Sequence, residues 1–162
     1  MKPMRVYIDT SVFGGCFDEE FEEPSKGFFE AVLEGKIVPL ISDSLVAELA
    51  GAPERIQGLL ERIIDAGCER LPLAPEVEQL RTAYVSAEVV TGKFAGDALH
   101  VAHATLAKAD AIVSWNFKHL VNPRQVRAFN VVNVRNDRSL VVIMTPADIL
   151  SVLEETDEPQ ED

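Results

Sequence analysis

Apolar residues recur along this chain with two alternating patterns: short runs typical of strands, and longer stretches with the spacing of a helix face. Strand-like runs are predicted at 5–8, 37–41, 111–115 and 140–144. Helical spacing is found between and after them, at 24–33, 44–50, 53–64, 75–87, 98–109 and from 146 onward. Alternation of strands and helices predicts an α/β fold, with a central, mostly parallel sheet covered by helices on both faces.

Proline and glycine mark the ends of these segments. Pro53 and Pro75 each open a predicted helix, and Gly35 and Gly67 each follow one. The pattern is weakest over 116–139, where only a short helix after Pro123 is predicted. Since the 162 residues contain no internal repeat and no Ser- or Gly-rich linker, we expect one domain over 1–153 and an acidic tail over 154–162.

The formal net charge of −12 is concentrated in two segments, 18–23 and 154–162. These segments hold 11 of the 27 acidic residues and no base, which leaves 16 acidic residues against 15 basic ones elsewhere. Both acidic runs are typical of a solvated loop or tail. The acidic balance disfavours a protein that coats DNA but is compatible with an enzyme that acts on RNA.

The apolar stretches are far too short to cross a bilayer, and the first ten residues, MKPMRVYIDT, carry no cleavage motif of a signal peptide. Cys16 and Cys68 stand in unrelated contexts without metal-binding or CxxC spacing. We therefore expect a cytoplasmic protein with reduced thiols and no membrane association.

Four polar residues come from separate segments next to the predicted strands. Asp9 directly follows the first strand, Glu48 lies on the helix after the second, Asp97 begins the helix before the third, and Asn116 follows that strand. Because functional groups of open parallel sheets gather beyond the carboxyl ends of the strands, we expect these four to converge at one edge.

Three carboxylates held close together repel one another, and a divalent cation is the usual remedy. Hard oxygen ligands favour Mg²⁺ or Mn²⁺, which polarise a phosphodiester and lower the pKa of a bound water. Taken singly, each residue also has an ordinary role: Asp9 and Asp97 as helix caps, Glu48 as a solvated helix residue and Asn116 as a turn residue. It is the ordered set that indicates a metal site.

The strings YIDTSVF, SDSLVAEL, GDALHVAHA and IVSWNFKHL, in this order, resemble the PIN-domain family, which includes the VapC-type toxin ribonucleases. The resemblance spans about residues 4–150 and implies a three-layer α/β/α sandwich, metal-dependent RNA cleavage, an antitoxin protein partner and a homodimer. By motif, Asp9, Glu48 and Asp97 match its metal-binding carboxylates. The small hydroxyl residues near them are matched by Thr10, Ser11 and Ser114.

In one respect the chain departs from this pattern, because many members carry a fourth Asp where Asn116 stands. Further candidates for contact with substrate or carboxylates are His100, Lys118 and His119, each of which could equally be a packing or surface residue. His100 and His103 lack the Glu of the HExxH pattern, which argues against zinc.

Basic residues follow the strand at 111–115 and could form a rim that contacts phosphates or simply a solvated surface; they are Lys118, Arg124, Arg127, Arg135 and Arg138. Trp115 could stack on a base, although a Trp at a strand end is more often part of the core.

Three functions remain as alternatives to a toxin ribonuclease. A housekeeping RNA-processing nuclease would use the same site. A non-catalytic PIN-like module binding RNA or protein is motivated by Asn116 and the acidic charge. A phosphatase of the haloacid-dehalogenase type would need a second Asp two positions after Asp9, where this chain has Ser11.

Overall fold

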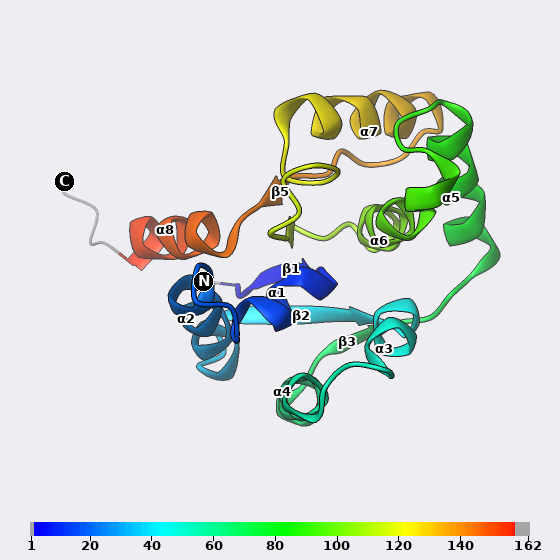
Figure 1. The fold of residues 1–162 in the computed structure, drawn as a ribbon. Helices are drawn as coiled ribbons and strands as arrows, with labels where there is room; N and C mark the ends of the chain where they lie inside the picture. The colour runs from blue at the N-terminus through cyan, green and yellow to red at the C-terminus, as the bar shows by residue number, and fades with distance from the viewer. Residues whose placement is uncertain (1, 158–162) are drawn as a thin grey trace, which may run out of the picture.

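The computed structural model describes residues 2–157, and its centre is one sheet of five strands in the order β3-β2-β1-β4-β5 (Figure 1). Every neighbouring pair is parallel, which confirms the predicted α/β class. The central strand is β1, since Val6 pairs with Pro39 of β2 on one side and Ala111 of β4 on the other. The strand bounds are β1 Met4–Ile8, β2 Ile37–Ser42, β3 Glu69–Leu71, β4 Ala111–Val113 and β5 Ile143–Met144.

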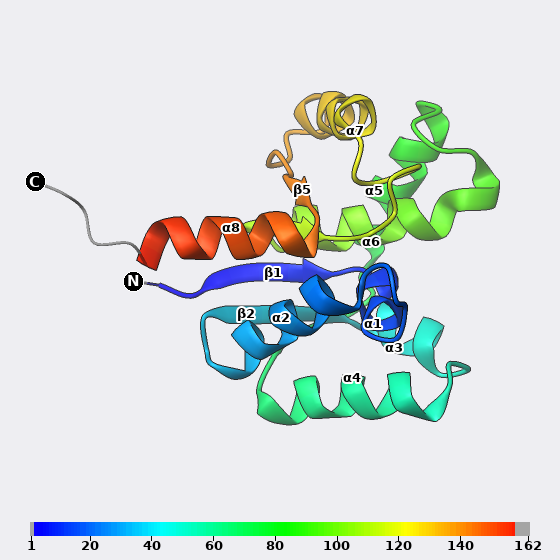
Figure 2. The same ribbon diagram turned by 60° about the vertical axis from the view of Figure 1, so that its left-hand side comes forward.

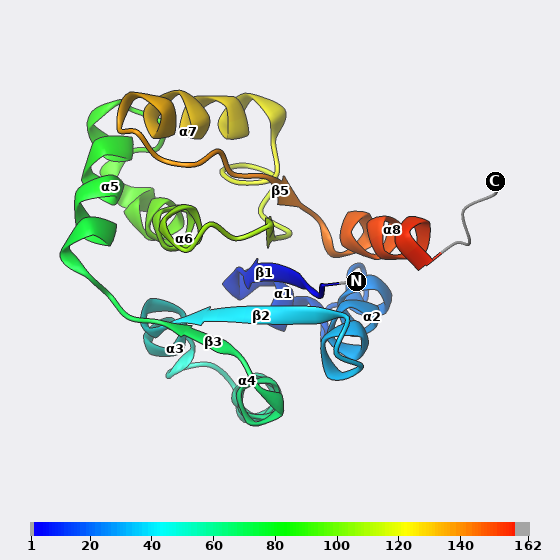
Figure 3. The same cartoon turned by 180° about the vertical axis from the view of Figure 1, so that it is seen from behind.

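Helices cover both faces of the sheet and complete three layers. In Figures 1 and 3, α5, α6 and α7 lie together on one side, and α2 and α8 lie together on the other. The helix bounds are α1 Thr10–Gly15, α2 Glu22–Leu33, α3 Asp43–Leu49, α4 Glu54–Ala66, α5 Pro75–Ser86, the 3-10 turn η1 Gly92–Phe94, α6 Ala95–Leu106, α7 Pro123–Arg135 and α8 Pro146–Asp157. Among the described residues, none of these helices is both long enough and apolar enough to span a membrane.

The two-residue period of β1 divides the apolar core between the faces. Val6 and Ile8 belong to the cluster under α1, α2 and α4, whereas Tyr7 belongs to the cluster under α5, α6 and α7. All three side chains are fully buried, as expected for a central strand covered on both faces.

Local sequence signals set several helix ends. The Ser42 hydroxyl accepts a hydrogen bond from the backbone N–H of Leu45 and so caps α3. Asn122 caps α7 in the same way, and Pro123 occupies its first turn. Gly35, at φ +82°, turns the chain after α2 in a conformation that favours glycine.

The structure departs from the predicted elements mainly in short segments. Strand β3 was not predicted, because three residues are too few to show a period. The strand predicted at 140–144 is reduced to Ile143–Met144, and α7 is longer than the short helix expected. Helix α8 continues to Asp157, so the first part of the expected acidic tail is helical, while 158–162 lie outside the described residues.

The parallel arrangement brings the ends of β1, β2 and β4 to one edge. Figure 2 shows β1 and β2 pointing toward the end of the sheet where α1 and α3 lie. The chain leaves β1 directly into α1, and leaves β2 directly into α3. This edge positions the candidate site.

Candidate functional site

Asp9 lies in the connection between β1 and α1 and is only 4% exposed. Its side chain makes no capping bond to α1, although the residue occupies the cap position. Instead Oδ2 accepts hydrogen bonds from the hydroxyls of Ser11, at 2.7 Å, and Ser114, at 2.8 Å. The Asp9 backbone N–H donates to the carbonyl of Val113 at 3.0 Å. Residues that follow β1 and β4 thus fix this carboxylate, which is therefore not a simple helix cap.

The two serines also hold the loop after β4. Ser11 Oγ accepts from the backbone N–H of Trp115 at 2.9 Å, and Ser114 Oγ accepts from that of Asn116 at 2.9 Å. Each hydroxyl therefore connects the Asp9 carboxylate to the backbone of this loop. Ser11 and Ser114, predicted from the resemblance, both lie at the site.

Asp97 lies in the first turn of α6, which begins at Ala95 with Phe94 in the cap position. It is thus not the helix cap either. Burial raises the pKa of Asp97, and the negative charge of Asp9 raises it further, against smaller lowering effects of His119 and Asn116. The Asp9 and Asp97 carboxylates are therefore close enough to repel each other, although they come from distant parts of the sequence.

Glu48 reaches the same region from α3 with a half-exposed side chain. Its Oε2 is 2.7 Å from Nε2 of His100, and this hydrogen bond lowers the pKa of Glu48, with a smaller contribution from Thr10. Thr10 Oγ1 lies 3.5 Å from the same His100 nitrogen. Glu48 is consequently held as an anion by its neighbours.

Behind Glu48, a chain of hydrogen bonds runs through the core. The Tyr7 hydroxyl is 2.7 Å from Ser42 Oγ and 2.5 Å from Nδ1 of the buried His100. One direction satisfies every group: Ser42 donates to Tyr7, Tyr7 donates to Nδ1, and Nε2–H donates to Glu48. Burial acts to lower the pKa of His100, but hydrogen bonding to Glu48 and the neighbouring carboxylates leave it raised.

The roles of Tyr7 and Ser42 in this hydrogen-bond chain were not predicted from the sequence. Their signals were a hydroxyl in the middle of the apolar run 6–8 and a serine at the end of the run 37–41.

Asn116 follows β4 as predicted, but both ends of its amide are engaged. Oδ1 accepts from the backbone N–H of His119 at 2.9 Å, which is the ordinary turn role. Hydrogen bonding of its side chain to Asp97 lowers the pKa of that carboxyl. Here Asn116 supplies a donor to Asp97 where an aspartate would have supplied a fourth negative charge. The amide oxygen of Asn116 therefore faces the turn.

The donor set fits a hard divalent cation in part. Asp9 and Asp97 repel each other, and a cation between them would relieve this repulsion. The hydroxyls of Ser11 and Ser114 both donate to the same oxygen of the Asp9 carboxylate, Oδ2. Yet no three His, Cys, Asp or Glu side chains within residues 2–157 gather closely enough to hold a metal ion. His100 holds Glu48 in its present position. The structure thus brings two of the three predicted metal ligands together and places the third beside them.

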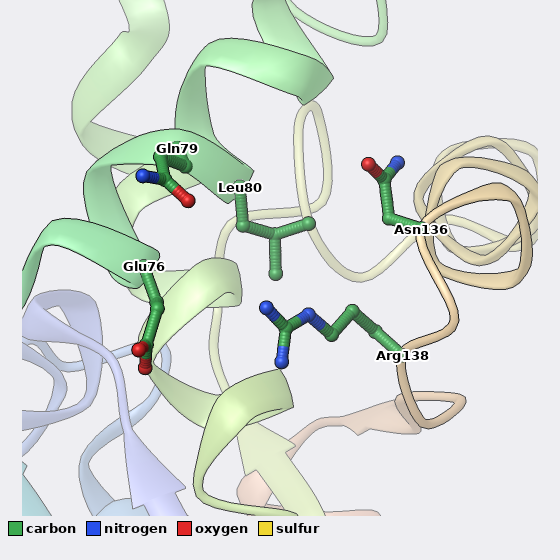
Figure 4. Close-up of a pocket in the computed structure, with 5 residues that line it drawn as sticks. All are labelled: Glu76, Gln79, Leu80, Asn136 and Arg138. Carbon is green, nitrogen blue, oxygen red and sulfur yellow. The ribbon is translucent and has the colours of Figure 1, made fainter.

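A separate small pocket of about 80 Å³ lies between α5 and the turn after α7, lined by Glu76, Gln79, Leu80, Asn136 and Arg138 (Figure 4). None of the predicted carboxylates lines it. Figure 4 shows the Arg138 side chain extending toward Leu80, so this residue belongs to that pocket and not to a rim around the carboxylates.

Comparisons with known proteins give a likeness of fold. No family model matches the sequence, and no curated protein matches it. Among solved structures, the chain superposes on one from the crystal structure of VapBC2 from Rickettsia felis bound to a DNA fragment from their promoter. The TM-score is 0.56 at 16% identity, over 88% of this chain and 98% of that chain. The two chains share a fold. At this identity the comparison supports the architecture and leaves the chemistry to the residues.

Proposed function

We propose that this chain is a PIN-like, metal-dependent endoribonuclease that hydrolyses RNA phosphodiester bonds. One observation carries the proposal: the Asp9 and Asp97 carboxylates, from distant segments, lie close enough that the charge of Asp9 raises the pKa of Asp97. Burying like charges together destabilises a fold, so such a pair is typical of a functional site. Its place at the carboxyl edge of a parallel sheet agrees with this interpretation.

Asp9 and Asp97 would hold Mg²⁺ or Mn²⁺, with Glu48 as the third acidic group beside them. The ion would polarise the phosphodiester and lower the pKa of the attacking water. The residues of the chain tune these acids: Ser11 and Ser114 fix Asp9, the amide of Asn116 lowers the pKa of Asp97, and His100 keeps Glu48 ionised.

The biological role that we propose is the toxin of a toxin–antitoxin pair. The similarity in fold to a chain of VapBC2 supports this role over housekeeping RNA processing. An antitoxin protein would then be the partner, and a homodimer is part of the same proposal. Expression of the chain should arrest growth of the host cell, and expression of Asp97→Asn should not.

The direct test is cleavage of a mixed pool of structured RNAs by the purified protein with Mn²⁺, with Mg²⁺ or with EDTA. We expect cleavage only with metal, and a loss of about 100-fold or more in Asp9→Asn and Asp97→Asn. Asp65→Asn is the matched control, because Asp65 is exposed on α4 and loses the same charge. Equal cleavage by Asp97→Asn and the wild type would refute the proposal.

A binding module without turnover is the second candidate, and the neutral Asn116 favours it. This module would retain RNA while failing to bind Mn²⁺. Calorimetric titration of the folded protein with Mn²⁺ separates the two, since the nuclease must bind the ion and lose that binding in Asp97→Asn.

A further inference from the structure

The loop after β4 alternates aromatic and polar side chains beside the carboxylate site. Trp115, Phe117 and His119 alternate with Asn116 and Lys118. The backbone of this loop is fixed by the hydroxyls that bind Asp9, as described above. Its side chains therefore occupy defined positions next to the place where a scissile bond would lie.

Phe117 is the exposed member of an aromatic group, with 51% of its surface accessible. Its ring centroid is 6.2 Å from that of Trp115 and 6.5 Å from that of Phe21. Trp115 and Phe21 stack on each other at 4.3 Å, and the indole N–H donates to Ser25 Oγ at 2.8 Å. The exposed ring is thus backed by a fixed aromatic surface, which suits stacking of an unpaired base.

Two lysines from different segments approach one aromatic ring. Nζ of Lys93, in η1, lies 5.6 Å from the centroid of Phe94, and Nζ of Lys118 lies 5.7 Å from it. Phe94 immediately precedes α6, the helix that carries Asp97. Neither lysine forms an ion pair within the described part of the chain, so their charges are available to an anion.

His119 supplies a third polar group at the same ring. Its imidazole centroid is 4.1 Å from that of Phe94. The buried Nε2 atom of His119 has no hydrogen-bond partner among residues 2–157. A buried nitrogen without a partner is costly, and an oxygen of a bound molecule would satisfy it.

We propose that Lys93, Lys118 and His119, grouped around Phe94, bind the phosphate next to the scissile one in single-stranded RNA, while Phe117 stacks on an unpaired base. This inference rests on the proposed nuclease function, because it assigns the RNA to the same edge. It adds Lys93, Phe94 and Phe117, none of which is among the candidates predicted from the sequence, and gives Lys118 and His119 a specific role.

Charge complementarity favours an RNA phosphate as the occupant. The acidic groups of the site repel a polyanion, in a chain whose formal net charge is −12. Cations beside the carboxylates would offset this repulsion and bring the backbone of the substrate into register. The aromatic surface adds affinity only for a base that is not already stacked in a duplex.

The test measures binding separately from cleavage. Fluorescence anisotropy with a labelled single-stranded RNA of about 12 nucleotides, in EDTA over a salt series, gives the affinity and its salt dependence. We expect Lys93→Gln and Lys118→Gln each to weaken binding about fivefold and to reduce the slope of log K against log salt by about 0.7. Phe117→Leu should weaken binding by a similar factor of about five without changing the slope, because stacking releases no counterions.

Lys108→Gln is the matched control. Lys108 is exposed just beyond the other end of α6, about 18 Å away along the helix, and its loss should leave binding unchanged.

The outcomes separate this inference from the proposed nuclease. If the wild type cleaves RNA with metal, but Lys93→Gln and Lys118→Gln bind RNA as the wild type does, the phosphate site is wrong and the nuclease stands. If binding depends on these lysines but no metal-dependent cleavage occurs, the phosphate site stands and the nuclease is wrong. A wild type that binds no single-stranded RNA overturns the phosphate site.

Discussion

Gly15, at the end of α1, occupies a position where no side chain fits. A Cβ there would lie 2.5 Å from Ser25 Oγ and 2.8 Å from Nε1 of Trp115. These two atoms are the partners of the hydrogen bond that ties the loop after β4 to α2. Gly15→Ala must therefore push the hydroxyl and the indole apart.

The expected cost follows from three contributions. Overpacking of a tight site costs about 1–3 kcal/mol. Loss of the hydrogen bond adds about 1 kcal/mol, and the better helix propensity of alanine returns about 0.5–1 kcal/mol. The net destabilisation is about 2 kcal/mol, which corresponds to a decrease in Tm of about 4–8 °C for a domain of this size.

Urea unfolding followed by tryptophan fluorescence measures this effect, since Trp115 is the single tryptophan of the chain and one of the displaced groups. Gly14→Ala is the control, because a Cβ at Gly14, in the same helix, would meet no atom within 4 Å. This control should be stabilised by about 0.5–1 kcal/mol. If Gly15→Ala unfolds at the wild-type urea concentration, the packing argument is wrong.

Three further predictions concern buried polar groups. Burial and the charge of Asp9 raise the pKa of Asp97, so the folded chain loses stability as pH rises from the ordinary pKa of an aspartate through that raised value. Asp97→Asn should therefore raise the Tm at pH 7 in EDTA, as measured by scanning calorimetry. A lower Tm would contradict this reasoning. Tyr84→Phe removes the hydroxyl that donates to Asn133 Oδ1 and should cost about 1–3 kcal/mol in urea unfolding. Burial lowers the pKa of His103 to about 4, so the unfolded chain binds a proton that the folded chain does not. This residue alone should lower the stability by about 3 kcal/mol as pH falls from 6.5 to 4, and urea unfolding at the two pH values should show a smaller loss in His103→Gln.

The longer elements could be predicted from the sequence because their patterns are local. The strand-like run over 5–8 and the helical spacing over 98–109 can be recognised from neighbouring residues alone, and Pro75 is a strong signal for a helix start. Strand β3 was missed because its pairing depends on distant residues: it lies beside β2, and Glu69 forms an ion pair with Arg5 of β1. Such a contact leaves no trace in a three-residue pattern.

For the candidate site, the rule that parallel strands gather functional groups at their carboxyl ends was enough to select Asp9 and Asp97. It could not predict that His100 would hold Glu48, because that hydrogen bond joins side chains distant in the sequence. Nor could it predict that the Asn116 oxygen would face a turn, because the backbone N–H of His119 in that turn binds it. Lys93 was missed because its role depends on tertiary packing. Lys93 is the sequence neighbour of Phe94, but only tertiary packing brings Lys118 to the same ring.

The strand order has a consequence for synthesis of the chain on the ribosome. Strand β1 pairs with β2 early, through Met4 and Ile37, but its other partner, β4, begins only at Ala111. The edge that carries Asp9 and Glu48 can therefore form well before Asp97 and Asn116 join it. A nascent chain therefore cannot bring Asp9, Glu48, Asp97 and Asn116 together until Asn116 has been translated.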